Sequence, residues 1–594
     1  MKVNKNIFVY IGIVFFSCSC NKLDQLPKST VTKDAVFNSE RGLELYISSL
    51  YDILPDAGGI MREDNMADYT ARREVPEFIR LGAYSPRQST GWDWEHLRNI
   101  NYFIANCNNE SISLEIRNHY IGIARFFRAF FYFEKVKRFG DVPWVSEPFD
   151  IDNERLFSGR DSREVVIDEI LNDIDFAIEN ITMLNDASRT LITKYVALAL
   201  KSRICLFEGT FRKYHTNYDL TESVDFLLQE GRDAAKIIID ESGFSLNINP
   251  DPNMSYRQVF TSLSPISSEV ILANQYNDAL SVYHDANWYW TSATYGDRAS
   301  LTRTFINTYL YLDGTSFTDD PDYKKTVFTD EVKDRDLRLS QTIRTPGYTR
   351  VNGGVAEEAP PLFSYTFTGY QPIKWTLDDF FYDSGQRNDN TIPIFRYAEI
   401  LLNYAETLAE LGVLTDSDWS NTIGQLRSRA GITDGLASKP TQVDRYLQSV
   451  YFEDIADPAI LEIRRERGIE LVFEGFRFYD LVRWKKGELM EQKWNGMYVP
   501  SLNTPIDLNG DGVLDVAFYT GSISNQLSGV TYINVSPSIG GGTNPYSLTQ
   551  GTSGEINWLN NVSRIWNDKF YLYPIPEADR LINPNLGQNP GWQE

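Results

Sequence analysis

Apolar residues recur at the spacing of an α-helix in two separate blocks of this chain, and this pattern limits the possible folds more than any other feature. The first block lies within residues 20–247 and the second within residues 391–484. Each apolar stripe needs a neighbouring helix to cover it, and short connections between stripes favour antiparallel pairs. We therefore predict a mainly α fold with a tetratricopeptide-like scaffold of helical pairs, although no clean repeat of about 34 residues is present.

Helix start and stop signals support both blocks. Asp161 and Glu164 form a candidate capping box before the stripe that ends at Ile181, and Thr193 can cap the following helix. Gly412 can end a helix and Gly475 can interrupt one, because glycine adopts backbone conformations that other residues avoid. The other predicted helices span residues 116–131, 222–239, 397–411, 421–429 and 460–484.

The two remaining segments, residues 248–390 and 485–594, are rich in Asp, Gly, Pro and aromatic residues and contain only short strand-like runs. Long irregular segments in a compact protein are usually functional or disordered. The chain holds 12 Trp, 34 Tyr and 34 Phe, which argues against disorder. We expect the helices to form a scaffold and these loop-rich insertions, with a few short strands, to form the working surface.

The N-terminus resembles an export signal. Lys2 and Lys5 precede an apolar run over residues 7–16, which is too short to span a bilayer. The run ends in Ser17-Cys18-Ser19-Cys20, and a Cys after a small residue resembles a bacterial lipobox. We predict a lipoprotein signal peptide over residues 1–19 and lipidation of Cys20, with Cys18 as the alternative site. Ordinary signal cleavage beside an incidental Cys pair is the other interpretation.

Charge and motif content exclude several functions. The net charge of -24 argues against nucleic-acid binding, which needs a basic face. The sequence contains no HExxH, GxSxG or GxxxxGK[ST] motif, although two carboxylates could still meet in space as in a glycosidase. No other apolar run is long enough to span a membrane either, so a lipid anchor would be the only membrane attachment. Cys107 and Cys205 lie on apolar helical stripes, which predicts buried free thiols, although an exported compartment would permit a disulfide.

Residues 507–515, DLNGDGVLD, resemble the first part of an EF-hand loop. The candidate calcium ligands are Asp507, Asn509, Asp511, the carbonyl of Val513, and Asp515. The Glu expected at the last ligand position is replaced by Phe518. We expect that no cofactor is required and that a structural calcium ion is the one candidate. The alternative is a turn rich in Asn, Asp and Gly, held by its own side chains.

Several segments in chain order resemble the SusD/RagB family of outer-membrane nutrient-binding lipoproteins. The resemblance is carried by residues 94–101 (WEHLRNIN), 124–129 (ARFFRA), 138–143 (RFGDVP), 396–406 (RYAEILLNYAE), 464–471 (RRERGIEL), 474–484 (EGFRFYDLVRW) and 588–592 (QNPGW). It implies a single SusD-like domain over residues 20–594 with a tetratricopeptide-like scaffold. It also implies a SusC-like TonB-dependent transporter as the partner, at the cell outer membrane and facing the exterior.

Charged residues within these motifs are expected to be structural. They lie on helices dense in apolar residues, where opposite charges pair rather than meet a ligand. The residues concerned are Arg125, Arg128, Arg427, Arg429, Glu466 and Glu470.

Aromatic loop residues are the candidate ligand surface, because a flat ring covers the apolar C–H face of a sugar while polar groups bind its hydroxyls. One candidate segment is residues 283–295, where an extended backbone would put Trp288 and Trp290 on one face. The other is residues 64–92. The candidate ligand-binding residues are Asp68, Arg72, Arg73, Trp92, Tyr283, Asn287, Trp288, Tyr289, Trp290 and Tyr295. Packing of these rings against the scaffold is the alternative.

The sequence therefore predicts a non-catalytic glycan-binding lipoprotein that delivers oligosaccharide or polysaccharide to its transporter. Peptide capture in the same transport system is the alternative among binding proteins. A glycoside hydrolase and a purely structural surface protein are the alternatives from other classes.

Overall fold

The computed structural model describes residues 33–593 of the chain. The predicted signal peptide and both candidate lipidation sites, Cys18 and Cys20, lie outside these residues. Within the described residues, no helix is both long enough and apolar enough to cross a membrane. Helices make up most of the regular structure, so the predicted mainly α fold is confirmed.

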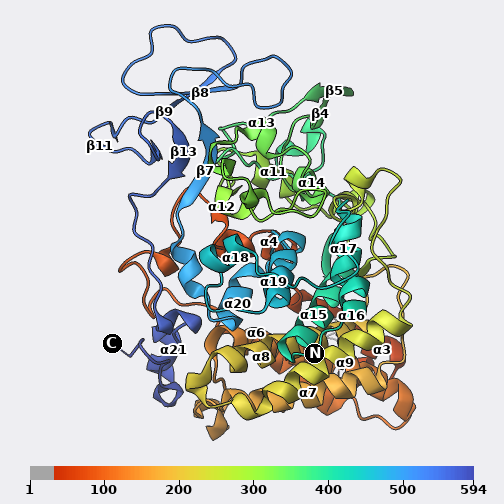
Figure 1. Cartoon of the computed structure of the whole chain (residues 1–594). Coiled ribbons are helices and arrows are strands. Elements are labelled where there is room, and N and C mark those ends of the chain that lie inside the picture. The colour runs from red at the N-terminus through yellow and green to blue at the C-terminus, as the bar shows by residue number, and fades with distance from the viewer. Residues whose placement is uncertain (1–32, 594) are drawn as a thin grey trace, which may run out of the picture.

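The long helices of the first helical block form the base of the molecule in Figure 1, and its short helix α4 lies nearer the middle. The long helices pack in sequence-adjacent pairs, α6 along α7 and α8 along α9, as the short connections predict. The helices of this block are α2 Lys33–Phe37, α3 Glu40–Ser48, α4 Ala57–Met61, α5 Glu95–Asn106, α6 Leu114–Phe139, α7 Arg163–Asn180, α8 Lys194–Tyr214 and α9 Val224–Glu241.

Two of these helices test the predicted caps. Thr193 caps α8, because its side chain accepts a hydrogen bond from the backbone N–H of Val196, as predicted. The predicted capping box on α7 is wrong. Ser162 caps that helix instead, and the Asp161 carboxylate accepts a hydrogen bond from the backbone N–H of Trp144 at 2.7 Å.

The second helical block packs onto the first through α15, which contacts α8 and α9 on one side and α19 on the other. Gly412 follows α15 with φ 71°, and Gly475 separates α19 from α20 with φ 83°, as the sequence predicts for both glycines. A Cβ atom on Gly475 would lie 3.0 Å from the Cβ atom of Glu63, so the backbone there also approaches the first block closely. The helices of this block are α15 Tyr397–Glu410, α16 Asp416–Asn421, α17 Ile423–Arg429, α18 Arg445–Val450, α19 Pro458–Glu470 and α20 Arg477–Arg483.

Most of the loop-rich segments form the upper part of the molecule in Figure 1, whereas α21 lies at the lower left, beside the base. They contain short helices as well as the predicted short strands, which build a three-stranded sheet in the order β12-β13-β7 and several two-stranded pairs. The short helices are α10 Gln258–Thr261, α11 Ala286–Thr291, α12 Arg303–Ile306, α13 Phe328–Glu331, α14 Leu337–Thr342 and α21 Glu577–Ile582. The strands are β1 Thr70–Ala71, β2 Val270–Asn274, β3 Ser300–Leu301, β4 Thr349–Asn352, β5 Val355–Glu358, β6 Ile392–Arg396, β7 Trp494–Val499, β8 Val516–Tyr519, β9 Thr531–Asn534, β10 Ser538–Ile539, β11 Gly542–Thr543, β12 Tyr546–Leu548 and β13 Gly554–Trp558.

Buried ion pairs join the scaffold to the loops. Glu470 on α19 accepts from Arg396 at the end of β6 at 2.6 Å and from Arg338 on α14 at 3.0 Å, and it also pairs with Arg429. Arg128 pairs with Asp173 at 2.6 Å. The predicted structural role of the motif charges is therefore confirmed, with Arg125 the loosest case at 3.7 Å from Asp173. Both remaining cysteines, Cys107 and Cys205, are buried free thiols, as predicted.

Candidate functional site

Residues 286–291 form the short helix α11, so the extended backbone that would put Trp288 and Trp290 on one face is not present. In a helix, positions two apart point in different directions. Trp288 is half-buried at the surface, whereas Trp290 is 4% exposed and packs edge-on against Phe473 at 4.9 Å between ring centroids. Tyr289 is also buried, and Asn65 donates a hydrogen bond to its hydroxyl oxygen at 2.8 Å. Of these three aromatic residues, only Trp288 offers a face to solvent.

Trp288 stacks on Tyr295, with ring centroids 3.7 Å apart and planes inclined by 11°. The Tyr295 hydroxyl donates to the Asp285 carboxylate at 2.5 Å, and Arg62 donates to the same oxygen. The hydrogen bond to Asp285 is the main cause that raises the pKa of the Tyr295 phenol, because burial of this side chain is slight. These contacts hold a stacked pair of rings in a fixed orientation at the surface.

The arginines predicted to bind ligand instead hold the loop that carries Tyr295. Arg72 pairs with Asp297, and the Arg73 guanidinium donates to the carbonyl oxygens of Ala293 and Gly296, the latter at 2.9 Å. Asp68 is 3% exposed and forms a bidentate ion pair with Arg477 at 2.7 and 2.8 Å. We therefore assign these three side chains a positioning role rather than ligand contact.

Asn287 joins α11 to the short 3-10 helix η11, Phe380–Asp383. Its amide nitrogen donates to the Leu377 carbonyl at 2.8 Å and to the Asp383 carboxylate at 3.0 Å. Its amide oxygen accepts from the Leu377 backbone N–H and from the Asn388 side chain, both at 2.7 Å. Asn287 is fully buried, so it fixes η11 beside α11 and has no surface of its own to offer a ligand.

Sequence reasoning missed the rings of η11. Two buried arginines clamp the segment: Arg257 binds the Asp378 carboxylate at 2.6 and 2.8 Å, and Arg350 binds the Asp383 carboxylate at 2.7 Å. Between these clamps the side chains of Phe380 and Phe381 are 45% and 60% exposed. The available signal was three consecutive aromatic residues, Phe380 to Tyr382, inside an Asp-rich run.

Tyr283 and Tyr382 lie beside two carboxylates. The Tyr283 hydroxyl donates to the Asp278 carboxylate at 2.6 Å. An antiparallel bridge between His284 and Asn388 brings Tyr283 close to Asp389. Burial, followed by the charges of Asp389, Asp379 and Asp278, raises the pKa of Tyr382. Ring faces therefore lie next to carboxylate oxygens that can accept hydrogen bonds from hydroxyl groups.

Six accessible or half-buried rings on these adjoining segments form what we call the aromatic surface. Its members are Tyr283, Trp288, Tyr295, Phe380, Phe381 and Tyr382. Three of them belong to the predicted ligand residues. Trp92 does not join this surface: it is 9% exposed and packs edge-on against Trp94 at 5.3 Å and Phe139 at 5.0 Å.

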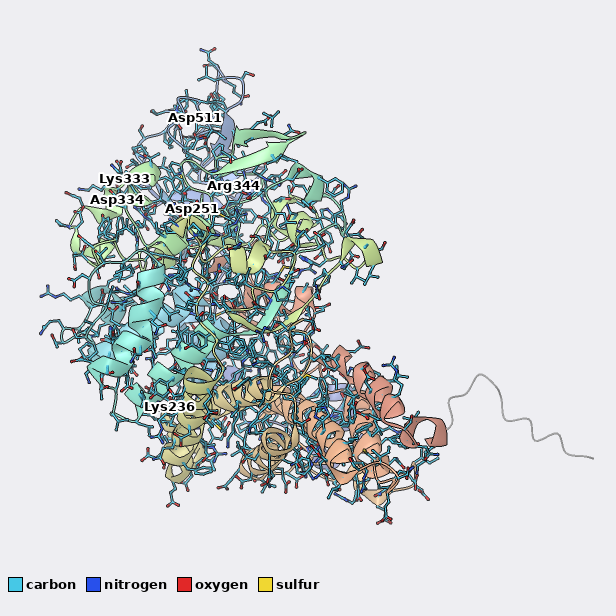
Figure 2. All side chains as sticks on the ribbon, turned by 90° about the vertical axis from the view of Figure 1, so that its right-hand side faces the viewer. Lys236, Asp251, Lys333, Asp334, Arg344 and Asp511 are labelled. Atoms are coloured by element: carbon cyan, nitrogen blue, oxygen red, sulfur yellow. The ribbon has the colours of Figure 1, made fainter. Side chains whose placement is uncertain are left out.

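The loop that resembles a calcium site uses its carboxylates internally. Asp507 accepts backbone hydrogen bonds from Asn509, Gly510 and Gly512 at 2.7 to 3.1 Å, and Asp515 accepts one from Leu508 at 2.7 Å. Figure 2 places Asp511 near the end of the molecule opposite Lys236, which lies on α9 in the base. Across residues 33–593, no three His, Cys, Asp or Glu side chains are grouped to hold a metal ion. Calcium binding at Asp507, Asn509, Asp511, Val513 and Asp515 stays a prediction.

Comparison with family models gives two matches. Residues 268–592 match the model of the SusD family, and residues 63–194 match a model described as starch-binding associating with outer membrane. Together these matches include α11, η11 and both helical blocks in part.

Individual proteins give the same picture. Two SusD-like proteins of Formosa agariphila, P25 and P38, are 23% and 24% identical to this chain; the alignments cover 82% and 84% of it and 90% and 95% of those proteins. A crystal structure of a SusD-like protein from Bacteroides fragilis superposes with a TM-score of 0.67 at 22% identity, covering 94% of this chain and 98% of that one. A SusD-like carbohydrate binding protein of the same species superposes with a TM-score of 0.66 at 22% identity, covering 93% and 100%.

Proposed function

Because this chain belongs to the SusD family, we propose that it is a non-catalytic glycan-binding lipoprotein of the outer membrane that delivers its ligand to a SusC-like TonB-dependent transporter. The observation that carries the proposal is the aromatic surface, which displays six rings on two adjoining segments, and two buried arginines clamp the η11 segment. A structural relative is described as carbohydrate binding, which supports a glycan as the ligand class. Location on the cell exterior and anchoring through Cys20 belong to the same proposal.

Preorganisation is the physical reason why this surface suits a sugar polymer. The Trp288–Tyr295 stack and the η11 rings are fixed before any ligand arrives, so little conformational entropy is lost on binding. Pyranose C–H faces can cover the rings, while the carboxylates of Asp278 and Asp389 can accept hydrogen bonds from hydroxyl groups. Neither contact requires a metal ion or a catalytic residue.

Isothermal titration with a panel of soluble polysaccharides tests the proposal. Trp288→Ala and Phe381→Ala should each weaken binding of the best glycan by about tenfold, because each removes one stacking face. Phe226→Ala is the matched control, since Phe226 is a ring 54% exposed on α9, outside the aromatic surface. Unchanged affinity in both test variants would refute the proposed site.

The alternatives give different results with the same protein. Tight binding of unstructured peptides, with none of the glycans bound, would favour peptide capture. New reducing ends on incubation with polysaccharide would favour a glycoside hydrolase. Normal glycan uptake by cells that carry the Trp288→Ala, Phe381→Ala double variant would favour a structural surface protein.

A further inference from the structure

A cavity of about 290 Å³ lies inside the helical scaffold, where α6, α8 and α20 meet the segment around α4 and Glu63. Phe130 and Phe133 from α6, Phe207 from α8, and Phe476 and Tyr479 at α20 line it with aromatic rings. None of these residues belongs to the aromatic surface. Ligand pockets in proteins usually start at about 300 Å³, so this cavity has the size for one small molecule.

The mouth of the cavity is acidic and open to solvent. Glu63 is exposed, and the side chain of Glu134 is 44% exposed. Lys137 neutralises Glu134 at 2.6 Å. Within residues 33–593, by contrast, no hydrogen bond or ion pair reaches the Glu63 carboxylate. The other lining carboxylates are paired with arginine or lysine: Glu399 with Arg203, Glu474 with Arg396 and Lys374, and Asp480 with Arg467 and Arg483.

Two guanidinium groups that line the cavity each have one nitrogen with no hydrogen-bond acceptor among the described residues. Arg203 donates from Nε and Nη2 to the Glu399 carboxylate, both at 2.7 Å, and from Nη2 to the Ile394 carbonyl oxygen at 2.8 Å. Arg467 donates from Nε to the nearer carboxylate oxygen of Asp480 and from Nη1 to the amide oxygen of Asn403, both at 2.8 Å. Among the described residues, no acceptor reaches Nη1 of Arg203 or Nη2 of Arg467. The cavity thus combines one unpaired carboxylate with unused guanidinium donors.

We propose that this cavity is a second binding site that takes a small organic zwitterion, such as a free amino acid. The ammonium group would pair with Glu63, the carboxylate would accept from Arg203 and Arg467, and an apolar side chain would pack against the phenylalanine rings. An uncharged sugar of similar size would leave the Glu63 charge without a partner, which is why we favour a zwitterion. This inference does not depend on the proposed glycan site.

Calorimetry at pH 8 with L-leucine and three related probes tests the inference on the unmodified protein. L-leucine should bind at one site. N-acetyl-L-leucine lacks the ammonium group and L-leucinamide lacks the carboxylate, so each should bind at least about tenfold more weakly. Methyl glucoside should give no signal at this site. No binding of L-leucine, or equal binding of the derivatives, would overturn the inference.

Variants locate the site. Glu63→Gln should weaken L-leucine binding by at least about tenfold, whereas the control Glu357→Gln on the exposed strand β5 should not. Trp288→Ala should leave L-leucine binding unchanged even where it weakens glycan binding, so each site can fail independently of the other. Undiminished L-leucine binding by a folded Glu63→Gln protein would place the ligand elsewhere and refute the assignment.

Discussion

Glu470 is the residue on which the scaffold's buried charge converges. Burial alone would raise its pKa, but the guanidinium groups of Arg429, Arg396 and Arg338 hold the pKa of this carboxyl well below its usual range. Glu470→Gln removes the one carboxylate that these three arginines share and leaves them to the remaining buried carboxylates, Glu269, Glu474, Asp336 and Glu466. We expect a loss of about 3–5 kcal/mol in the free energy of unfolding, measured by urea denaturation. The exposed Glu179 on α7 supplies the control: a loss of similar size in Glu179→Gln would contradict this account.

The pKa of Glu63 is shifted in the opposite direction to that of Glu470, so its contribution to the stability of the fold should change with pH in the opposite sense. Glu63 is accessible to solvent at the cavity mouth, but the protein around its carboxyl desolvates it and raises its pKa to about 7, with smaller effects from Lys137, Glu134, Asp64 and Arg138. A raised carboxyl pKa stabilises the fold below the unfolded value near 4.5, and this contribution is lost as the pH rises through about 7. Glu63→Gln should therefore melt at the same temperature as the parent protein at pH 4.5 and at a higher temperature at pH 8. A variant that melts lower at pH 8 would contradict the prediction.

The sequence was informative about single residues where burial is dictated by a helical stripe. Arg429 and Glu470 lie among apolar neighbours, so their pairing could be predicted without knowing the partner. Asp68 and Arg72 could not be assigned in the same way, because they lie in irregular sequence. Their partners, Arg477 and Asp297, are remote in the chain, and only the tertiary structure reveals that Asp68 and Arg72 are already in ion pairs.

At the scale of elements, Asn287 is the connection on which the arrangement of α11 and η11 depends. Asn287→Ala removes hydrogen bonds to Leu377, Asp383 and Asn388. We expect a loss of about 2–4 kcal/mol in the free energy of unfolding, at about 1 kcal/mol for each hydrogen bond. Amide hydrogen exchange should rise over residues 377–383, and glycan affinity should fall several-fold because the η11 rings lose their fixed orientation. Unchanged exchange in that segment would contradict the role assigned to Asn287.

The predicted calcium loop is a second element that can be tested alone. Within the described residues, no hydrogen bond joins residues 507–515 to α11 or η11, so we expect EDTA to leave glycan affinity unchanged. Calcium titration into EDTA-treated protein then reports on the loop itself. One bound ion with a raised melting temperature, both lost in Asp507→Asn, would establish the site. Absence of heat would leave a turn held by the Asp507 carboxylate, and loss of glycan binding in EDTA would contradict the independence of the two regions.

Helix α11 explains why element prediction failed at the site. Six residues are too few to separate helical from extended periodicity, and a Trp-Tyr-Trp run satisfies both. The η11 segment was missed because its clamps, Arg257 and Arg350, lie far from it in sequence. The long helices, by contrast, carry several turns of apolar stripe each, and α7, α9 and α15 were predicted within a few residues of their ends. The predicted end of α6 at residue 131 falls short of its actual end at Phe139.

For the whole molecule, the distribution of structure between base and top follows from the two kinds of sequence. Periodic apolar stripes produce the helical base, and aromatic, Gly- and Asp-rich segments produce the upper part in Figure 1. Short helices and ion pairs such as Arg338–Glu466, at 2.8 Å, hold that upper part on the scaffold. This is why loops that lack long regular elements can still present a rigid surface to a ligand.

Attachment to the membrane is the prediction that concerns the entire protein. In this proposal the protein is anchored by a lipid carried by Cys20. Cys20→Ser should move the protein from the membrane pellet to the soluble fraction of lysed cells, while Cys18→Ser should leave it in the pellet. The reverse result would assign the lipid to Cys18. If both single variants and the double variant stay in the pellet, lipidation is not the anchor, because no acylated thiol would remain in the N-terminal segment.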